Sequence, residues 1–499
     1  MNSTTESVPY VLHPLVSSVH ADTETPVSVY MKLKGPYSCL LESVEGEENL
    51  ARFSYIAIDP VAILSGSVDG ETSVVVRDER FSAMEGIPGE TRDLREAIDK
   101  ALAMFSSGEY HLTGPAGSSM TTSGAFGYFS YDTMHLVERI PVAHKPDPSG
   151  LPDVCLLFCD KLVVFDNVRR SVFIVVNYLD EADLPRARRA MEEIRAKMFL
   201  SLDPEDRQLH RELPAEVVSN TRKEDYLEKV RAAKEYIMSG DIFQVQVSQR
   251  LRRPLNVPAL DVYRMLRTIN PSPYLYYFDM EEFRIVGSSP ELLVRVADDA
   301  DGRRLVDTRP IAGTRRRGRD HATDLSIEAE LLADEKERAE HLMLIDLSRN
   351  DIGRIAKIGS VETNEMMIIE RYSHVMHIVS NVRGELKDEL TPMDAFWACF
   401  PAGTLTGAPK VRAMEIIAEL EEEKRGLYGG AVGFIDFRGQ IETAIAIRTM
   451  VVRDGIIYFQ AAGGIVADSV PENEFEETMN KMRAGLRTLE SLEHAGEDE

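Results

Sequence analysis

Short apolar runs rich in β-branched residues recur along this chain, and they constrain its fold more than any other feature. They occupy residues 27–34, 54–58, 61–68, 73–77, 154–158, 162–165 and 171–176. Runs of this kind predict β-strands, and Asp166-Asn167 between the last two is typical of a hairpin turn. Helix-period patterns over residues 91–105 and 184–200 interrupt them. This succession predicts an α+β fold with mixed, largely antiparallel sheets and packed helices.

The second half of the chain continues the pattern. Strands are predicted at residues 243–248, 274–278, 283–287, 430–436, 443–453 and 456–461, and helices at 223–238, 324–355 and 472–490. In the first of these strands, apolar residues alternate with Gln244, Gln246 and Ser248. Buried amides need hydrogen-bond partners, so this face either lines a ligand site or is the wet face of an edge strand. Ala462-Gly463-Gly464 predicts a backbone bend after the last strand.

Chain length and one polar segment predict the division into domains. A chain of 499 residues with 43% hydrophobic residues can form two or three structural units with sizeable cores. The segment 202–220 is polar, contains Pro204 and Pro214 and has no clear period, so it is predicted to be a linker. It would separate an N-terminal unit, residues 1–201, from a C-terminal unit, residues 221–499.

The charge balance excludes some partners. Lys and Arg total 57 against 83 Asp and Glu, which gives a net charge of −26. We therefore expect neither nucleic acid nor an anionic membrane as a partner, and the pocket for an anionic small substrate would have to be locally basic. The sequence has no apolar stretch of membrane-spanning length and no signal-peptide pattern, which predicts a cytoplasmic protein. Buried, reduced thiols are expected at Cys39, Cys155, Cys159 and Cys399.

Two acidic clusters have helical spacing. Glu337 and Glu340 would share one helix face, and Glu474, Glu477 and Lys481 would share another. Two helices that each offer a carboxylate pair can hold one hard cation, and Mg²⁺ favours few carboxylates together with water and oxygens from an anionic substrate. The alternative is that both clusters are solvated faces of acidic helices.

A series of motifs follows in a fixed order through residues 222–490. They read Ser288-Ser289-Pro290-Glu291-Leu292, Pro310-Ile311-Ala312-Gly313-Thr314-Arg315, Val375-Met376-His377, Pro401-Ala402-Gly403-Thr404-Leu405-Thr406-Gly407-Ala408-Pro409-Lys410, Arg425-Gly426-Leu427-Tyr428-Gly429-Gly430 and Pro471-Glu472-Asn473-Glu474-Phe475-Glu476-Glu477-Thr478. In this order they resemble the chorismate-utilising enzymes. Within that family, Leu40-Leu41-Glu42-Ser43 and Arg52-Phe53-Ser54-Tyr55-Ile56 resemble the large subunits of anthranilate synthase. These subunits convert chorismate and ammonia to anthranilate and pyruvate, the first step of L-tryptophan biosynthesis.

The resemblance implies a metal site and a set of substrate contacts. Mg²⁺ would be held by Glu340 and Glu477, with Glu337 and Glu474 beside them, and would bind the ring carboxylate of chorismate. The implied substrate contacts are Gly313, Thr314, Tyr428, Arg448, Ala462, Gly463, Gly464 and Lys481. Tyr428 and Arg448 would bind the pyruvyl carboxylate, because the planar guanidinium of arginine meets a carboxylate with two hydrogen bonds. Backbone amides of the predicted glycine bend would assist them.

The resemblance also implies a catalytic set, Glu291, His377, Gln244 and Thr404. Glu291 would protonate the departing C4 hydroxyl, and burial should raise the pKa of such an acid. His377 would assist loss of the ring proton and elimination of pyruvate; a purely structural histidine is the alternative. Thr404 would contact chorismate.

Two positions distinguish the predicted reaction from its relatives. Isochorismate and salicylate synthases carry a water-activating lysine where Gln244 stands, and an amide side chain cannot accept that proton. Aminodeoxychorismate synthases carry a lysine at the position of Ala312. The resemblance therefore favours amination at C2 by ammonia.

Regulation and partners follow from the same resemblance. An L-tryptophan feedback site would be formed by Ser43, Pro273, Tyr274 and Leu275, partly in the N-terminal unit. No cysteine has a glycine neighbour, so the chain lacks the nucleophile elbow of a glutamine amidotransferase. Ammonia would come from a separate amidotransferase subunit, in a heterotetramer with two copies of each chain. The alternatives are a sister aminase that makes 4-amino-4-deoxychorismate and a silent subunit that only binds tryptophan.

Overall fold

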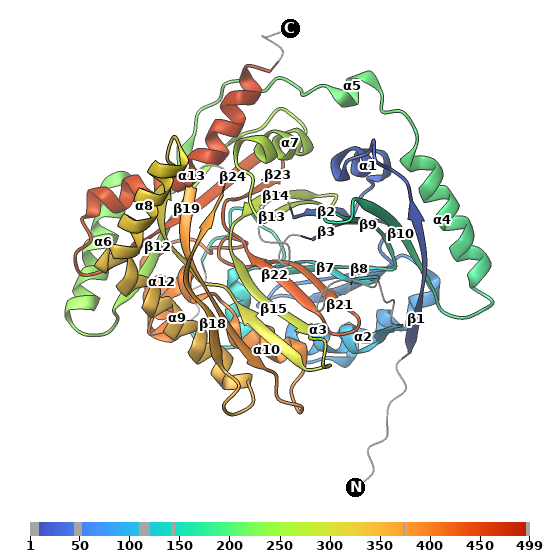
Figure 1. The fold of residues 1–499 in the computed structure, drawn as a ribbon, viewed down its shortest axis with the longest axis horizontal. Coiled ribbons are helices and arrows are strands. Elements are labelled where there is room, and N and C mark those ends of the chain that lie inside the picture. Colours follow the sequence, from blue (N-terminus) through green and yellow to red (C-terminus); the bar gives the residue numbers. More distant parts are fainter. Residues whose placement is uncertain (1–8, 44–51, 109–119, 141–144, 373–374, 496–499) are drawn as a thin grey trace.

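The computed structural model describes residues 9–43, 52–108, 120–140, 145–372 and 375–495, which form two large β-sheets with helices outside them (Figure 1). The larger sheet has 13 strands within these ranges, in the order β11 (Val218–Ser219), β12 (Gln244–Pro254), β24 (Ile456–Ile465), β23 (Thr449–Arg453), β14 (Phe283–Ser289), β13 (Tyr274–Asp279), β2 (Ser38–Glu42), β3 (Phe53–Ala57), β9 (Lys161–Asp166), β10 (Ser171–Tyr178), β1 (Tyr10–Val19) and β6 (Phe105–Ser107), with β20 (Gly407–Ala408) beside β12.

The smaller sheet has 11 strands in the same described ranges. Their order is β17 (Ile311–Arg316), β19 (Val375–Glu385), β16 (Arg304–Thr308), β15 (Leu292–Asp298), β22 (Ile441–Ile445), β21 (Ala431–Asp436), β7 (Gly124–Phe129), β8 (Val154–Cys159), β4 (Ala62–Gly66) and β5 (Thr72–Val76), with β18 (Glu362–Arg371) beside β19. Of the described strand pairs, β1 and β6 run parallel and the others run antiparallel. The predicted α+β class with largely antiparallel sheets is confirmed.

The two sheets pack face to face and helices cover their outer faces (Figure 1). Side chains from both sheets, such as Tyr55, Val164, Phe126 and Leu157, form the core between them. The larger sheet is covered by α1 (Pro26–Leu33), α4 (Leu184–Met198), α7 (Ala259–Ile269) and α13 (Pro471–Glu493). The smaller sheet is covered by α3 (Leu94–Ala103), α9 (Glu335–Ile355) and α10 (Pro392–Cys399). The other helices are α2 (Ile87–Glu90), α5 (Pro204–Arg207), α6 (Lys223–Met238), α8 (His321–Ala333), α11 (Gly403–Thr406) and α12 (Lys410–Leu420).

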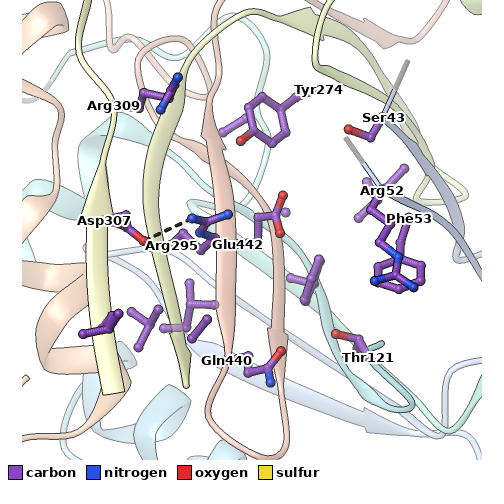
Figure 2. Close-up of a pocket in the computed structure, with 18 of the residues that line it drawn as sticks. Ser43, Arg52, Phe53, Thr121, Tyr274, Arg295, Asp307, Arg309, Gln440 and Glu442 are labelled. Atoms are coloured by element: carbon purple, nitrogen blue, oxygen red, sulfur yellow. Dashed lines mark hydrogen bonds and ion pairs between the residues drawn. The ribbon is translucent and has the colours of Figure 1, made fainter. Parts of the chain in front are cut away.

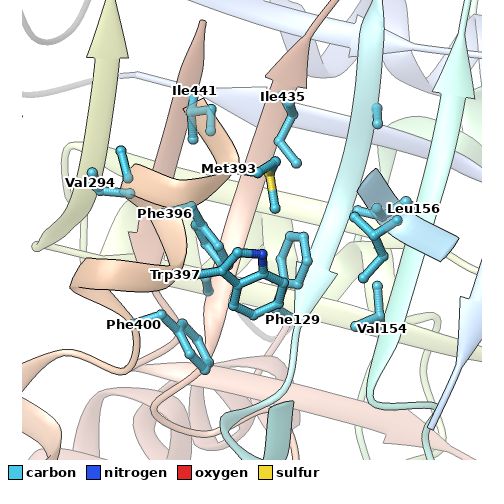
Figure 3. Close-up of a cluster of buried hydrophobic side chains, with 14 of the residues drawn as sticks. Phe129, Val154, Leu156, Val294, Met393, Phe396, Trp397, Phe400, Ile435 and Ile441 are labelled. Atoms are coloured by element: carbon cyan, nitrogen blue, oxygen red, sulfur yellow. The ribbon is translucent and has the colours of Figure 1, made fainter. Parts of the chain in front are cut away.

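An aromatic cluster fastens α10 to the smaller sheet (Figure 3). The indole of Trp397 meets the ring of Phe129 edge-on, with 5.6 Å between ring centroids, and also contacts Phe396 and Phe400. Such tilted and edge-on pairs are the favoured geometry of aromatic rings. The helix that this cluster holds leads into α11, which carries Thr404 to the candidate site described below.

Each sheet contains strands from both halves of the chain, which departs from the predicted division into residues 1–201 and 221–499. Strand β2 pairs with β13, and β7 pairs with β21. The two halves therefore share their cores. Residues 202–220 run mostly exposed between α4 and α6, as expected for a connection, but they do not separate two independent cores.

Two neighbouring segments of the chain pass side by side from one sheet to the other, and each forms a strand in both sheets. Strands β14 and β23 pair in the larger sheet, and their continuations β15 and β22 pair in the smaller one. The chain crosses at Pro290-Glu291 and at residues 446–448, where Arg448 has φ +50. The expected single strand over residues 443–453 is therefore wrong: its apolar sequence continues, but the backbone turns a corner between the sheets.

Three further predictions on local structure need correction. Residues 27–34 form helix α1 because Thr25 makes a capping box with Ser28 and Pro26 starts the first turn. The expected helix 324–355 is two helices, since Asp334 ends α8 and caps α9. The expected bend at Ala462-Gly463-Gly464 is absent, because these residues continue β24 and pair with β12.

The remaining long elements were predicted well. Helix α6 has the predicted bounds and ends before Gly240, whose φ is +83. The β9–β10 hairpin, α4 and α13 also lie where expected. All four cysteines are buried and unpaired. Among the described helices, none is both long and apolar enough to cross a membrane.

Candidate active site

A cavity of about 1210 Å³ opens where the corner between the sheets meets α9 and α13. It brings together all the residues predicted for catalysis, substrate and metal except Gly463. Gly463 does not line the cavity, and a Cβ there would lie 3.1 Å from both the hydroxyl of Tyr226 and the Oε2 atom of Glu474. Residues from Gln244 to Lys481 thus meet in one place.

The four predicted metal carboxylates face this cavity from two helices. Glu337 and Glu340 lie one turn apart on α9, and Glu474 and Glu477 lie one turn apart on α13. Burial raises the pKa of Glu340, and repulsion from Glu337 and Glu477 adds to the shift. Close carboxylates raise each other's pKa because their charges repel.

These acidic groups fit one cation held by few protein ligands. The Oε2 atom of Glu474 is buried and makes no hydrogen bond within the described structure. Gln244 Nε2 donates to Glu340 Oε1 at 3.3 Å, and Lys481 Nζ lies 2.7 Å from Glu477 Oε1. No group of three or more potential ligands converges closely enough in the described ranges to form a closed metal cage. Mg²⁺ does not need such a cage, because it keeps several waters and takes oxygens from an anionic substrate.

Glu291 lies at the corner where β14 leads into β15, and only 7% of its surface is exposed. Burial raises the pKa of its carboxyl group to about 8. The nearby hydroxyl of Thr404 and the guanidinium of Arg448 offset that shift only in part. At neutral pH the carboxyl is therefore mostly protonated, which is the form that a general acid requires.

His377 on β19 is placed to act as a neutral base. Its Nδ1 lies 3.2 Å from the carbonyl oxygen of Gly313 and 3.0 Å from the hydroxyl of Thr314. A carbonyl can only accept, so the contact with Gly313 puts the proton on Nδ1 and leaves Nε2 with a free lone pair. Nε2 is buried and has no hydrogen-bond partner among the described residues. Burial and the charge of Arg448 lower the pKa of His377 to about 4, which keeps the ring neutral.

A bulge in β17 creates this arrangement around His377. The register against β19 shifts between Ala312 and Thr314, and Gly313 has φ +63. A glycine with positive φ is the usual residue at such a bulge. A Cβ at Gly313 would also lie 3.1 Å from Leu331 and 3.3 Å from Glu337. The bulge therefore directs Thr314 to the histidine and leaves room for a ligand.

Arg448 supplies a cation without a counterion. Its guanidinium makes no ion pair or hydrogen bond with any residue that the structure describes. Burial lowers its pKa, and Glu291 is the carboxyl that opposes this effect. Tyr428 lines the same cavity, and burial raises the pKa of its hydroxyl. A half-buried guanidinium without a described ion pair is costly in a folded protein, and an anionic ligand would relieve that cost.

The amide-lined face of β12 points into the cavity. At its start β12 lies between β20, which pairs with Gln244 and Val245, and β24, so the alternative of an edge strand with a wet face is not what the structure shows there. Gln244 is 2% exposed, and both Gln244 and Gln246 line the cavity. A Cβ at Gly464 would lie 2.9 Å from Nε2 of each glutamine, so glycine on the neighbouring strand makes room for both amides.

The mouth of the cavity is locally basic in an acidic chain. Exposed cations that line it without a described ion pair are Arg316, Lys336, Arg483 and Arg487. The expectation that an anionic substrate would need a basic pocket is met. Such a rim attracts anions even though the whole chain carries a net charge of −26.

A second cavity, of about 550 Å³, lies between the sheets and contains most of the predicted feedback site (Figure 2). Ser43, Tyr274 and Leu275 line it. Pro273 does not line it, but its carbonyl oxygen accepts a hydrogen bond from the Ser43 hydroxyl at 3.0 Å. Sequence reasoning missed the opposite wall, where Arg295 pairs with Asp307 at 3.2 Å beside the buried Glu442. Those residues stand on ordinary-looking strands, and nothing in the local sequence marks them.

Comparisons with known proteins agree with this geometry. A family model described as chorismate binding enzyme matches residues 55–487. Anthranilate synthase component 1 of Acetivibrio thermocellus is 44% identical over an alignment of 509 positions, gaps included, that covers 98% of this chain and 97% of that protein. The protein of the same name from Pseudomonas aeruginosa is 45% identical over 493 residues and covers 97% and 96%.

Two solved structures have the same fold. Anthranilate synthase component I from Streptococcus pneumoniae TIGR4 superposes with a TM-score of 0.73 at 35% identity, covering 94% of this chain and 98% of its own. The menaquinone-specific isochorismate synthase MenF of Escherichia coli has a TM-score of 0.68 at 18% identity and covers 97% and 96%, which is a likeness of fold alone.

The two-sheet fold and the cavity at its corner place the chain in the class of chorismate-binding enzymes. Within that class, full-length identity of about 44% is decisive. The chain belongs to the anthranilate synthase component 1 family.

Proposed function

We propose that this chain is the catalytic subunit that converts chorismate and ammonia to anthranilate and pyruvate with Mg²⁺. One observation supports this reaction above all others. A buried carboxyl with a pKa of about 8, a neutral histidine with a free ring nitrogen and an unpaired guanidinium share one cavity. An acid, a base and an anion-binding group are the parts that amination and elimination on an anionic ring require.

In the first step ammonia attacks C2 of chorismate, and the C4 hydroxyl leaves as water with the proton of Glu291. Ammonia needs no base to make it nucleophilic, which suits the amide at Gln244. Ala312 lines the cavity and presents no amine, which disfavours the chemistry of the sister aminase. The unpaired Arg448 and the hydroxyl of Tyr428 hold the pyruvyl carboxylate.

In the second step Nε2 of His377 takes the proton from C2 of the aminated ring. The bond between the ring and the enolpyruvyl oxygen breaks, the ring becomes aromatic, and the methylene carbon gains a proton to give pyruvate. Nε2 is suited to this because its lone pair is not engaged within the described structure. The complete set of groups also disfavours a silent subunit that only binds tryptophan.

Glu340 and Glu477 are the proposed Mg²⁺ ligands, with Glu337 and Glu474 next to them. Bound Mg²⁺ would neutralise the ring carboxylate of chorismate and fix its position. The mutual repulsion that raises the pKa of Glu340, and the unpartnered oxygen of Glu474, support a cation at this place. Lys481 lies beside this site, with its Nζ 2.7 Å from Glu477 Oε1 and donating to the carbonyl of Ala462 at 3.0 Å.

The second cavity is the proposed L-tryptophan feedback site, and one short segment connects it to the active site. Residues 269–272 line the catalytic cavity, whereas Tyr274 and Leu275 line the second one. Glu42 in the second cavity pairs with Arg267 on α7 at 2.7 Å, directly before this segment. Tryptophan that favours one position of the segment would change the substrate site by its differential affinity for two states.

A partner subunit supplies ammonia in this proposal. The name component 1, which the relatives carry, implies a second component, and a glutamine amidotransferase fits the chain's own lack of a nucleophile elbow. Two copies of each chain in a heterotetramer is the proposed assembly. A reducing compartment such as the cytoplasm suits the four buried, unpaired cysteines.

Glu291→Gln tests the proposed chemistry through its pH dependence. In the wild type the protonated acid is active, so kcat/KM at fixed free ammonia should fall as pH rises through about 8. Glu291→Gln should lower kcat by about 10²- to 10⁴-fold and remove this fall. The control is Glu282→Gln, an exposed residue at the far end of β14. Full activity of Glu291→Gln would contradict the assignment.

A further inference from the structure

A small cavity of about 30 Å³ lies behind Glu291, on the side away from the substrate site. Glu291 and Thr404 line both cavities, whereas Thr308, Ser348 and Asp351 line only the small one. A cavity of this volume is large enough for a water molecule if it offers two or more polar partners. The mechanism above gives this cavity no role.

Two hydroxyl groups in this cavity point to bound water. The Oγ1 atoms of Thr308 and Thr404 are both buried, and neither makes a hydrogen bond of normal length with a described residue, although the Thr404 hydroxyl is close enough to Glu291 to lower the pKa of its carboxyl. A buried hydroxyl without a partner costs stability, so such groups are uncommon unless water satisfies them. Two of them in the wall of one small cavity are explained by one or two ordered waters between them.

The far wall of the cavity holds a buried ion pair. Asp351 on α9 is 5% exposed, and Lys410 Nζ lies 2.6 Å from its Oδ2. The side chain of Lys410 is 13% exposed, so this pair reaches solvent. Burial raises the pKa of Asp351, which makes its carboxylate a better proton acceptor than an exposed one.

The other charges near this path are already engaged or face the substrate. Arg309 lines the cavity but pairs with Glu365 and Glu370. Arg354 acts on Asp351 from the same helix, and Arg448 and Lys481 act on Glu291 from the substrate side. Lys410 is therefore the partner that joins Asp351 to solvent.

We propose that ordered water in this cavity joins Glu291 to Asp351, and that Asp351 and Lys410 return a proton to Glu291 after each turnover. Lys410 gives a proton to Asp351, Asp351 gives one to the water, the water gives one to the Glu291 carboxylate, and Lys410 regains one from solvent. Every group ends as it began, and one proton has moved from solvent to Glu291. The proposal rests on the general-acid role of Glu291; Thr308 and Asp351 are positioning residues.

This relay has a kinetic signature. Loss of the C4 hydroxyl uses the proton that Glu291 already carries, so kcat/KM does not depend on the relay when that step is irreversible. Return of the proton comes later and therefore limits kcat alone. A variant that only distorts the site would instead lower kcat/KM.

Thr308→Val is the sharpest test, because it removes a hydroxyl that has no protein partner and keeps the shape of the side chain. We expect kcat to fall by about tenfold or more, KM to fall in the same ratio, and the midpoint of thermal unfolding to stay equal or rise. The matched control is Thr363→Val, whose Oγ1 is also buried and unpartnered but lines none of the three described cavities. It should keep the wild-type kcat.

The wild-type rate of anthranilate formation tests the proposed function, and the ratio of variant to wild type tests the relay separately. An unchanged kcat in Thr308→Val would overturn the relay, as would a parallel fall in kcat and kcat/KM. Asp351→Asn combined with Lys410→Met, which leaves no charge buried alone, tests the other end of the path. It should show the same selective loss of kcat, and wild-type kcat in a folded double variant would overturn the role of the ion pair.

Discussion

Single buried charges determine what the candidate site can do. Glu291 and Arg448 lie on two adjacent crossings between the sheets, and the nearby cation does not prevent burial from raising the pKa of Glu291 to about 8. In the folded chain Glu291 binds its proton more tightly than in the unfolded chain, so it stabilises the fold least at alkaline pH. Both residues are thus held in states that are unfavourable for folding and useful for binding an anion and protonating a leaving group.

Arg448→Gln should separate binding from stability. Removing the guanidinium takes away the group proposed to hold the pyruvyl carboxylate, so KM for chorismate should rise about 100-fold. The same change removes a half-buried charge that has no described ion pair, so the midpoint of thermal unfolding should stay equal or rise. Steady-state kinetics and thermal unfolding measure the two effects. An unchanged KM would show that the anion binds elsewhere.

Regular elements could be predicted from the sequence where local pattern and tertiary structure agree. Helix α6 and the β9–β10 hairpin are of this kind, because period, capping and turn residues all coincide. The corner within residues 443–453 could not be predicted, since an apolar run continues through it and no glycine marks the positive φ of Arg448. The valines of helix α1 mimic a strand pattern and so predict a strand there, whereas the Thr25 cap and Pro26 start a helix.

The candidate site, too, is predicted by local sequence patterns only in part. Helical spacing alone placed Glu337 with Glu340 and Glu474 with Glu477, and period two placed Gln244 and Gln246 on one face. That these carboxylates and amides share one site with Glu291, His377 and Arg448 is predicted by the family resemblance and by no local sequence pattern. The burial of Glu291 and the wall of the second cavity that carries Arg295, Asp307 and Glu442 depend on which strands pair. No local sequence pattern predicts that pairing.

The segment 269–275 is the element through which the second cavity can act on the first. Ser43→Phe should place a large ring in the second cavity and break the hydrogen bond to the carbonyl of Pro273. Turnover without tryptophan should be unchanged, while inhibition by L-tryptophan should weaken by at least about tenfold. Anthranilate formation at increasing tryptophan measures both values in one experiment. Unchanged inhibition would move the feedback site elsewhere.

At the scale of the whole molecule, the two sheets share strands from both halves of the chain and place both cavities along their junction. Strand β13 pairs with β2 on one side and β14 on the other, so the proposed feedback site and the candidate active site belong to one continuous sheet. A ligand that binds between the sheets is therefore expected to act on the corner that carries Glu291 and Arg448.

Anthranilate fluorescence from the purified chain, supplied with chorismate, ammonium and Mg²⁺ near pH 8, tests the central claim most directly. We expect a signal that is lost on removal of Mg²⁺ and that falls when L-tryptophan is added, since the proposed metal ligands, acid and feedback site all lie in this one chain. Product mass distinguishes the alternatives, because only anthranilate has lost pyruvate. Chorismate consumed without anthranilate, or anthranilate formed equally well without Mg²⁺, would contradict the account.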